Sequence, residues 1–117
     1  MIEIKNLTKK FNKFTALNQV NIRFNDGHSV ALIGPNGCGK TTLIKCILGL
    51  NVVEDGDILV NNESVKEHYL YRKNIGYMPQ IGRYPENMTI AQTIQMIKDT
   101  RKVSENELDT ELLEAFE

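Results

Sequence analysis

The segment that most constrains this chain is Gly34–Thr41, which has the sequence Gly-Pro-Asn-Gly-Cys-Gly-Lys-Thr. It fills every fixed position of the pattern G-x-x-x-x-G-K-[ST]. The apolar run Val30–Ile33 precedes it. Apolar residues at helical spacing follow it as far as Gly49 and are expected on one face: Leu43, Ile44, Ile47 and Leu48. The pattern predicts a strand buried on both faces, then a glycine-rich loop, then a helix that ends at Gly49.

The residue types of this loop suit a nucleoside triphosphate. Glycines let successive backbone N–H groups point inward, and the start of the helix adds free N–H groups and a favourable dipole. Lys40 contributes a positive charge for the β- and γ-phosphates, and the Thr41 hydroxyl can ligate Mg²⁺. The alternative is a glycine-rich turn without a ligand. The apolar strand before the loop and the amphipathic helix after it favour the phosphate site.

Hydrophobic periodicity predicts the other elements. Strand segments are expected at residues 2–4, 20–24, 57–60 and 74–78, with a turn after the second of them. Thr89 with Gln92 forms a capping box that starts one helix, and Ser104 with Glu107 forms another. Strands and helices alternate, which favours an α/β fold with an antiparallel portion at the N-terminus.

Composition excludes several classes of function. The chain has 117 residues, enough for one small domain, and a net charge of -1, which indicates no general affinity for nucleic acid. No apolar run approaches the roughly 20 residues that span a bilayer. Cys38 and Cys46 are too few for a disulfide framework, so a reducing cytoplasm is the simplest compartment. His28 and His68 lack nearby metal-ligand partners and receive no role.

Four segments taken together resemble the ATP-binding subunits of ABC transporters. Residues Gly34–Leu43 resemble the Walker A segment, and Leu7–Phe11 resemble the A-loop, whose aromatic residue stacks on adenine. Glu54–Ile58 resemble the turn into the strand after the Walker helix, and Ile75–Gln80 resemble the Q-loop. The likeness covers essentially the whole chain. It implies an α/β P-loop NTPase core of ABC type with an antiparallel sheet over residues 1–85, followed by the start of a helical subdomain over 86–117.

The resemblance also implies a role for individual residues. ATP would be bound through Phe11, Gly34, Pro35, Asn36, Gly37, Cys38, Gly39, Lys40, Thr41 and Thr42. Thr41 and Gln80 would approach Mg²⁺, and Gln80 would be the catalytic residue. Phe11 stands where Tyr is more usual, which keeps a ring for stacking but loses a hydroxyl. Alternatives remain: Phe11 as a core aromatic of the sheet, and Gln80 as a solvated loop residue.

The implied partners are a transmembrane permease, in contact near residues 80–85, and a second ATP-binding subunit, with no nucleic acid. The implied location is cytoplasmic, on the inner face of the cell membrane through the permease. The transported solute contacts the permease, so this subunit carries little information about it. Residues 77–88 resemble ATPases associated with copper handling and nitrous-oxide-reductase maturation. Import and export both stay open.

Hydrolysis in this family needs segments that do not follow Gln80 here. They are the signature Leu-Ser-Gly-Gly-Gln, an apolar Walker B run that ends in Asp-Glu, and a switch His. The chain is therefore expected to be the first portion of an ATPase subunit, and to be inactive in hydrolysis by itself. The alternative is a nucleotide-binding or regulatory module that never hydrolyses ATP. A GTPase is not supported, because neither Asp-x-x-Gly nor Asn-Lys-x-Asp follows the loop.

Overall fold

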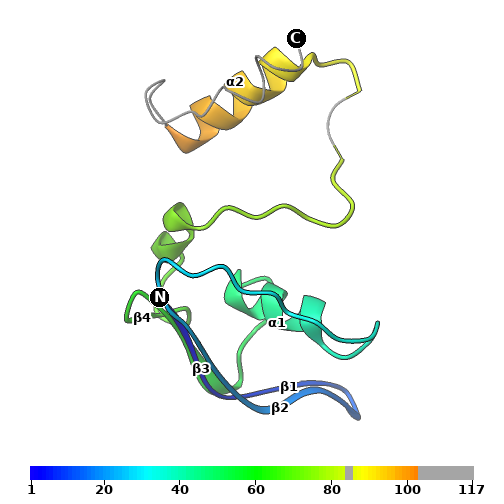
Figure 1. The fold of residues 1–117 in the computed structure, drawn as a ribbon, viewed down its shortest axis with the longest axis vertical. Helices are drawn as coiled ribbons and strands as arrows, with labels where there is room; N and C mark the ends of the chain where they lie inside the picture. The colour runs from blue at the N-terminus through cyan, green and yellow to red at the C-terminus, as the bar shows by residue number, and fades with distance from the viewer. Residues whose placement is uncertain (84–85, 103–117) are drawn as a thin grey trace. The chain divides into compact units, whose positions relative to one another are not determined.

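The computed structural model describes residues 1–83 and 86–102, and its contacts divide the chain into two units (Figure 1). The first unit runs from Met1 to Gly76 and the second begins at Tyr77. The first contains β1 (Ile2–Phe11), β2 (Phe14–Phe24), α1 (Lys40–Ile47), β3 (Asp55–Val60), β4 (Glu63–Ser64) and the 3-10 helix η1 (Leu70–Asn74). The described part of the second contains α2 (Ile90–Arg101).

The strands of the first unit form one sheet in the order β2-β1-β3-β4, with every neighbouring pair antiparallel. Phe11 pairs with Phe14 at the end of the β1–β2 hairpin. Asn61 and Asn62 join β3 to β4 with φ of 49° and 67°, as a two-residue type I′ turn requires. The antiparallel portion predicted at the N-terminus is confirmed, and β3 and β4 extend it.

Irregular pairing sets which residues of β1 face inward. The β1–β2 register shifts between Ile4 and Leu7, where Asn6 has a φ of 49°. Side chains at alternate positions of a strand share a face. After the shift, Leu7 and Lys9 are buried, so Phe11 continues the inward series at the end of the strand.

Helix α1 lies over this inner face (Figure 1). Its Leu43 and Cys46 side chains are buried in the core shared with the sheet. It ends as predicted, with Gly49 at a φ of 72° and the Leu50 amide donating to the Lys45 carbonyl. Ile44, which was expected on the apolar face, is exposed. The buried core consists of Ile4, Leu7, Leu17, Leu43, Cys46, Val53, Ile58, Val60 and Tyr71.

Two predicted strands are absent from the described residues. Val30–Ile33 makes no ladder, and its Ile33 side chain is 90% exposed rather than buried. At 74–78, η1 ends at Asn74, and the residues after it join no strand ladder, with Met78 88% exposed. A strand needs a hydrogen-bonding neighbour, and no described segment pairs with either stretch. Both predictions are therefore wrong for the described part of the chain.

Helix α2 begins where the capping box predicts. The Gln92 amide donates to Thr89 Oγ1 over 3.2 Å, and the Thr89 amide donates to Gln92 Oε1 over 2.9 Å. No α2 residue is buried within the described part of its unit. The capping box at Ser104 and Glu107 lies outside the described residues. Among the helices at 1–83 and 86–102, none has the length and apolarity needed to cross a bilayer.

Candidate nucleotide-binding site

The glycine-rich loop leads directly into α1. Gly39 is the residue before the helix, with φ of 101° and ψ of 4°, and the Leu43 amide donates to its carbonyl over 2.9 Å. Helix geometry therefore leaves the amides of Lys40, Thr41 and Thr42 without a partner inside the helix. These amides and the helix dipole favour an anion at this end of α1.

Gly39 also anchors the loop against the sheet. A Cβ atom at this position would lie 2.8 Å from the Ala16 carbonyl oxygen and 3.0 Å from Leu17 Cδ2. Its positive φ adds a conformational reason for glycine. The start of α1 is consequently held against β2 at Ala16 and Leu17.

The Lys40 side chain folds back over the loop. Its ammonium donates to the Gly34 carbonyl and, over 2.7 Å, to the Pro35 carbonyl, and it lies 3.4 Å from Cys38 Sγ. The Gly34 and Pro35 carbonyl oxygens are thus the acceptors of the Lys40 ammonium. Phosphate oxygens make shorter, charge-assisted bonds, so an entering phosphate can replace the carbonyls. Cys38 and Thr41 lie within two positions of Lys40 in the sequence, and both are exposed, so both can contact a ligand.

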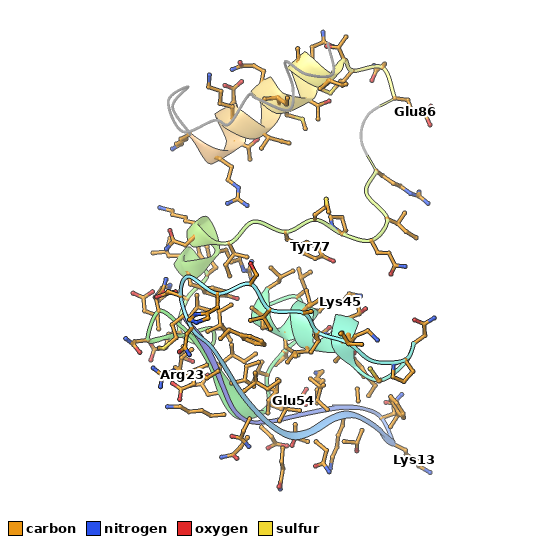
Figure 2. The ribbon with its side chains drawn as sticks, in the orientation of Figure 1. Lys13, Arg23, Lys45, Glu54, Tyr77 and Glu86 are labelled. Carbon is orange, nitrogen blue, oxygen red and sulfur yellow. The ribbon has the colours of Figure 1, made fainter. Side chains whose placement is uncertain are left out.

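Phe11 lies toward the same end of the sheet as the loop. Lys9 pairs with Leu17, and Leu17 contacts the Gly39 position at the start of α1. Phe11 is the next inward position of β1 beyond Lys9, and its ring is 44% exposed. Figure 2 shows the tip of this hairpin, labelled at Lys13, on the same side of the unit as the loop before α1. The alternative of a buried core aromatic is not supported, because Phe11 lies outside the core.

Lys9 is a buried charge that the sequence interpretation did not single out. The residue is only 6% exposed, and its ammonium donates to the Val52 carbonyl over 3.0 Å and to Glu54 Oε1 over 3.1 Å. The same ammonium lies over the Phe11 ring, 5.3 Å from its centroid. These partners offset the cost of removing the charge from water. The alternation of Leu7, Lys9 and Phe11 along β1 was the available signal.

The two cysteines differ in their exposure to solvent. Cys46 is fully buried, and burial raises the pKa of its thiol, while the positive charge of Lys9 opposes that rise. Cys38 is exposed in the loop. A buried thiol that keeps its proton is a poor nucleophile, so Cys38 is the accessible one of the pair.

The other residues named from the sequence are not part of the glycine-rich loop, and some lie outside the described residues. Gln80 is exposed in the unit that begins at Tyr77, and its approach to Mg²⁺ stays a prediction. Residues 84 and 85 of the expected permease contact are not described. His68 lies 3.3 Å from Glu63, and His28 bonds the Asp26 carbonyl. No group of metal-ligating side chains occurs within 1–83 and 86–102.

A polar groove of about 590 Å³ lies on the other face of the β1–β2 hairpin, with Thr8, Lys10 and Gln19 among its lining residues. Its polar groups already bond one another: the Gln19 amide donates to Thr8 Oγ1 over 3.0 Å. Thr8 and Lys10 alternate with the inward residues of β1, so the groove is separate from the loop and from Phe11.

An antiparallel sheet, a glycine-rich loop and the helix that follows it define an α/β P-loop fold of ABC type. The model of the family described as ABC transporter matches residues 17–116. This chain belongs to the ABC transporter family.

Two curated ATP-binding proteins are similar to this chain over most of its length. The sulfate/thiosulfate import ATP-binding protein CysA of Pseudomonas syringae pv. tomato is 36% identical over 113 residues, covering 97% of this chain and 35% of that protein. The CysA protein of Pseudomonas putida is 46% identical over 79 residues, covering 68% of this chain and 24% of that protein. The chain thus spans 24% and 35% of the length of these curated relatives.

Solved structures share the fold. An ATP-binding subunit of an ABC transporter has a TM-score of 0.81 and 31% identity, covering 91% of this chain and 45% of that one. A bacterial ABC transporter cassette solved as a dimer has a TM-score of 0.55 and 30% identity, covering 58% of this chain and 31% of that one.

Proposed function

We propose that this chain binds MgATP as the nucleotide-binding portion of an ATPase subunit that drives transport by a membrane permease. The observation that carries the proposal is the Lys40 ammonium folded over a glycine-rich loop at the start of α1. A single positive charge and the free amides of a helix converge there, which is the chemistry that a triphosphate needs. Membership of the ABC transporter family supports the same ligand.

The proposed contacts follow from position in the loop. The amides of 37–42 and the Lys40 ammonium hold the phosphates, and the exposed Thr41 hydroxyl ligates Mg²⁺. The exposed Phe11 ring stacks on the base from the same end of the sheet. Gln80 approaches the metal ion as the catalytic residue of the complete subunit.

The proposed partners are a transmembrane permease, with its contact near 80–85, and a second ATP-binding subunit. The relatives named as import ATP-binding proteins support the permease, and the dimeric cassette supports the second subunit. The proposed location is the cytoplasmic face of the cell membrane. The names of the relatives refer to sulfate and thiosulfate, whereas residues 77–88 resemble copper-related ATPases. The solute contacts the permease, so its identity is left to transport assays.

Replacement of Lys40 tests the site. Lys40→Ala should weaken the binding of fluorescent MgATP by about tenfold or more, because a charge-assisted hydrogen bond contributes roughly 1.5–3 kcal/mol. Lys45→Ala is the matched control, since Lys45 is exposed in the last turn of the same helix. Its MgATP affinity should equal that of the wild type. Equal affinities for all three proteins would remove the phosphate site.

The absence of a Walker B carboxylate from the 117-residue sequence favours binding without turnover by this polypeptide. Purified protein with MgATP should release phosphate no faster than buffer alone. Turnover near the roughly 1–10³ s⁻¹ of ordinary enzymes would show that another group positions the attacking water. The Lys40→Ala protein is the control for contaminating ATPases.

A further inference from the structure

The surroundings of Lys9 connect the Phe11 ring to the segment that follows α1. Val52 and Glu54 belong to that segment, and the Lys9 ammonium bonds to both over 3.0 Å and 3.1 Å. The side chain is 8% exposed, while the Glu54 carboxylate is 57% exposed. The ammonium is thus held by two protein acceptors, and it lies over the Phe11 ring at 5.3 Å from the centroid.

The Phe11 ring has two faces, and Lys9 lies over one of them. A cation is attracted to the electron-rich face of an aromatic ring by about 0.5–1 kcal/mol at exposed sites and more where water is excluded. Because Lys9 is fixed by Val52 and Glu54, this attraction orients the ring as well. The exposure of Phe11 leaves ring surface for a second planar group.

We propose that Lys9 is a positioning residue for the base: its buried ammonium holds the Phe11 ring so that the opposite face receives the purine. This inference rests on the proposed function, because it assumes that Phe11 stacks on the nucleotide. A ring that is already immobilised loses less conformational entropy when the base arrives. Lys9 therefore strengthens base binding without touching the ligand, and it contributes nothing to the phosphates.

Lys10 provides a matched comparison on the same strand. It is exposed and lines the polar groove on the opposite face of the sheet. Replacing either lysine by methionine removes one positive charge from β1 and keeps most of the side-chain length. Only the change at Lys9 removes a charge from the Phe11 ring.

The experiment compares the affinities of the 117-residue protein for MgATP and for magnesium tripolyphosphate, which has the phosphates without the base. Lys9→Met should lower the MgATP affinity by roughly three- to tenfold and leave the tripolyphosphate affinity unchanged. Phe11→Leu should lower the same ratio, and the double variant should match Phe11→Leu alone. Lys10→Met should keep the wild-type ratio. A purely structural Lys9 would change the urea midpoint without moving this ratio.

Glu54→Ala is the second variant, because it removes one exposed anchor and leaves Lys9 in place. It should lower the ratio in the same direction by about twofold. An unchanged ratio in Lys9→Met, or in Glu54→Ala should Lys9→Met fail to fold, would overturn the role of Lys9. An additive loss in the double variant would overturn it as well. If wild-type protein binds neither ligand, the proposed function fails and this inference with it. Loss of the ratio effect alone leaves the phosphate site intact.

Discussion

Val30–Ile33 and Asp57–Val60 are both short apolar segments of the first unit, yet their surroundings are opposite. In β3, Ile58 pairs with Ile4 and is fully buried, and Val60 pairs with Ile2 and is 4% exposed. In the segment before the glycine-rich loop, Val30 is 58% and Ile33 90% exposed. The two segments differ in whether neighbouring strands pair with them. β3 has β1 on one side and β4 on the other, whereas Val30–Ile33 pairs with no described segment.

Within the first unit, the residues that stabilise the fold are different from those that are accessible to a ligand. Its closed part is the sheet with the inner face of α1, where Ile4, Ile58 and Cys46 are buried together. Its open part is the largely exposed stretch at 28–41, which includes the glycine-rich loop. Apolar burial stabilises the closed part, since each buried side chain contributes roughly 1.5–3 kcal/mol. The open part keeps backbone amides and Lys40 accessible to a ligand. Substitutions in the two parts should therefore affect different measurements.

The largest expected effect is on the free energy of unfolding. Ile58→Ala should lower it by about 2–5 kcal/mol, because it leaves a cavity in the core that Ile58 shares with Ile4 and Cys46. Ile33→Ala removes the same atoms from an exposed position and should change it by less than about 0.5 kcal/mol. Urea unfolding followed by circular dichroism measures both. Equal losses would break the comparison, since they would require Ile33 to be buried in solution, for example against a second copy.

The next effect is on thiol labelling, which compares the two parts within one protein. N-ethylmaleimide should modify exposed Cys38 about 100-fold faster than buried Cys46, whose raised pKa also keeps the thiol protonated. The labelled loop should no longer bind MgATP, because the added group occupies the space beside Lys40. Mass spectrometry of peptides gives both rates.

Saturating MgATP should protect Cys38 and leave Cys46 unaffected. Faster labelling of Cys46 would show that the closed part opens more readily than the core packing predicts. A Cys38 rate that ignores MgATP would mean that the nucleotide does not occupy the loop.

Signals between residues close in the sequence predicted the fold best. Gly49 ends α1 because a left-handed residue after a helix favours glycine, and Thr89 with Gln92 starts α2 through reciprocal hydrogen bonds. The glycine-rich loop was likewise recognisable from the sequence, because its residue types all suit a phosphate ligand. Each of these features depends on a segment of roughly eight consecutive residues or fewer.

Features that depend on distant segments were harder to predict. The apolar composition of Val30–Ile33 indicated a buried strand, but pairing requires a partner from elsewhere in the chain. The burial of Lys9 depends on the register shift at Asn6 and on acceptors that lie more than 40 residues along the chain, at separations of 43 and 45. Ile44 was placed on the wrong face of α1 because Leu43, Cys46 and Ile47 already fill the contact with the sheet.

A smaller expected effect is the pH dependence of the unfolding free energy, which tests the burial of Cys46 in the closed part. Burial raises the pKa of the Cys46 thiol above its ordinary value of 9.0. Above that pH the unfolded thiol loses its proton while the folded one keeps it, so the folded state binds more protons and stability falls as pH rises. The Cys46→Ala variant has no thiol at this position and therefore lacks this loss of stability. The difference in unfolding free energy between wild type and Cys46→Ala should shrink by up to about 1 kcal/mol between pH 8 and pH 10.

Urea unfolding at four pH values measures that difference, and titration of other groups cancels because both proteins share them. Between pH 6 and pH 8 the difference should stay constant, which is the internal control. A constant difference up to pH 10 would mean that Cys46 reaches water in the folded state. The core around α1 would then be less closed than Ile58 suggests.

The smallest expected effect is the choice of base, which tests whether the open part reads anything beyond phosphate and a flat ring. The Phe11 side chain offers an aromatic face and no hydrogen-bonding group, so it stacks on adenine and guanine alike. We expect MgATP and MgGTP to compete for the site with affinities within about threefold of each other, a difference below about 1 kcal/mol. Displacement of a fluorescent ATP analogue by each nucleotide measures the ratio, and Phe11→Leu should weaken both to a similar extent. A preference near a hundredfold would require a side chain that bonds the edge of the base, and such a residue would have to lie outside the loop and Phe11.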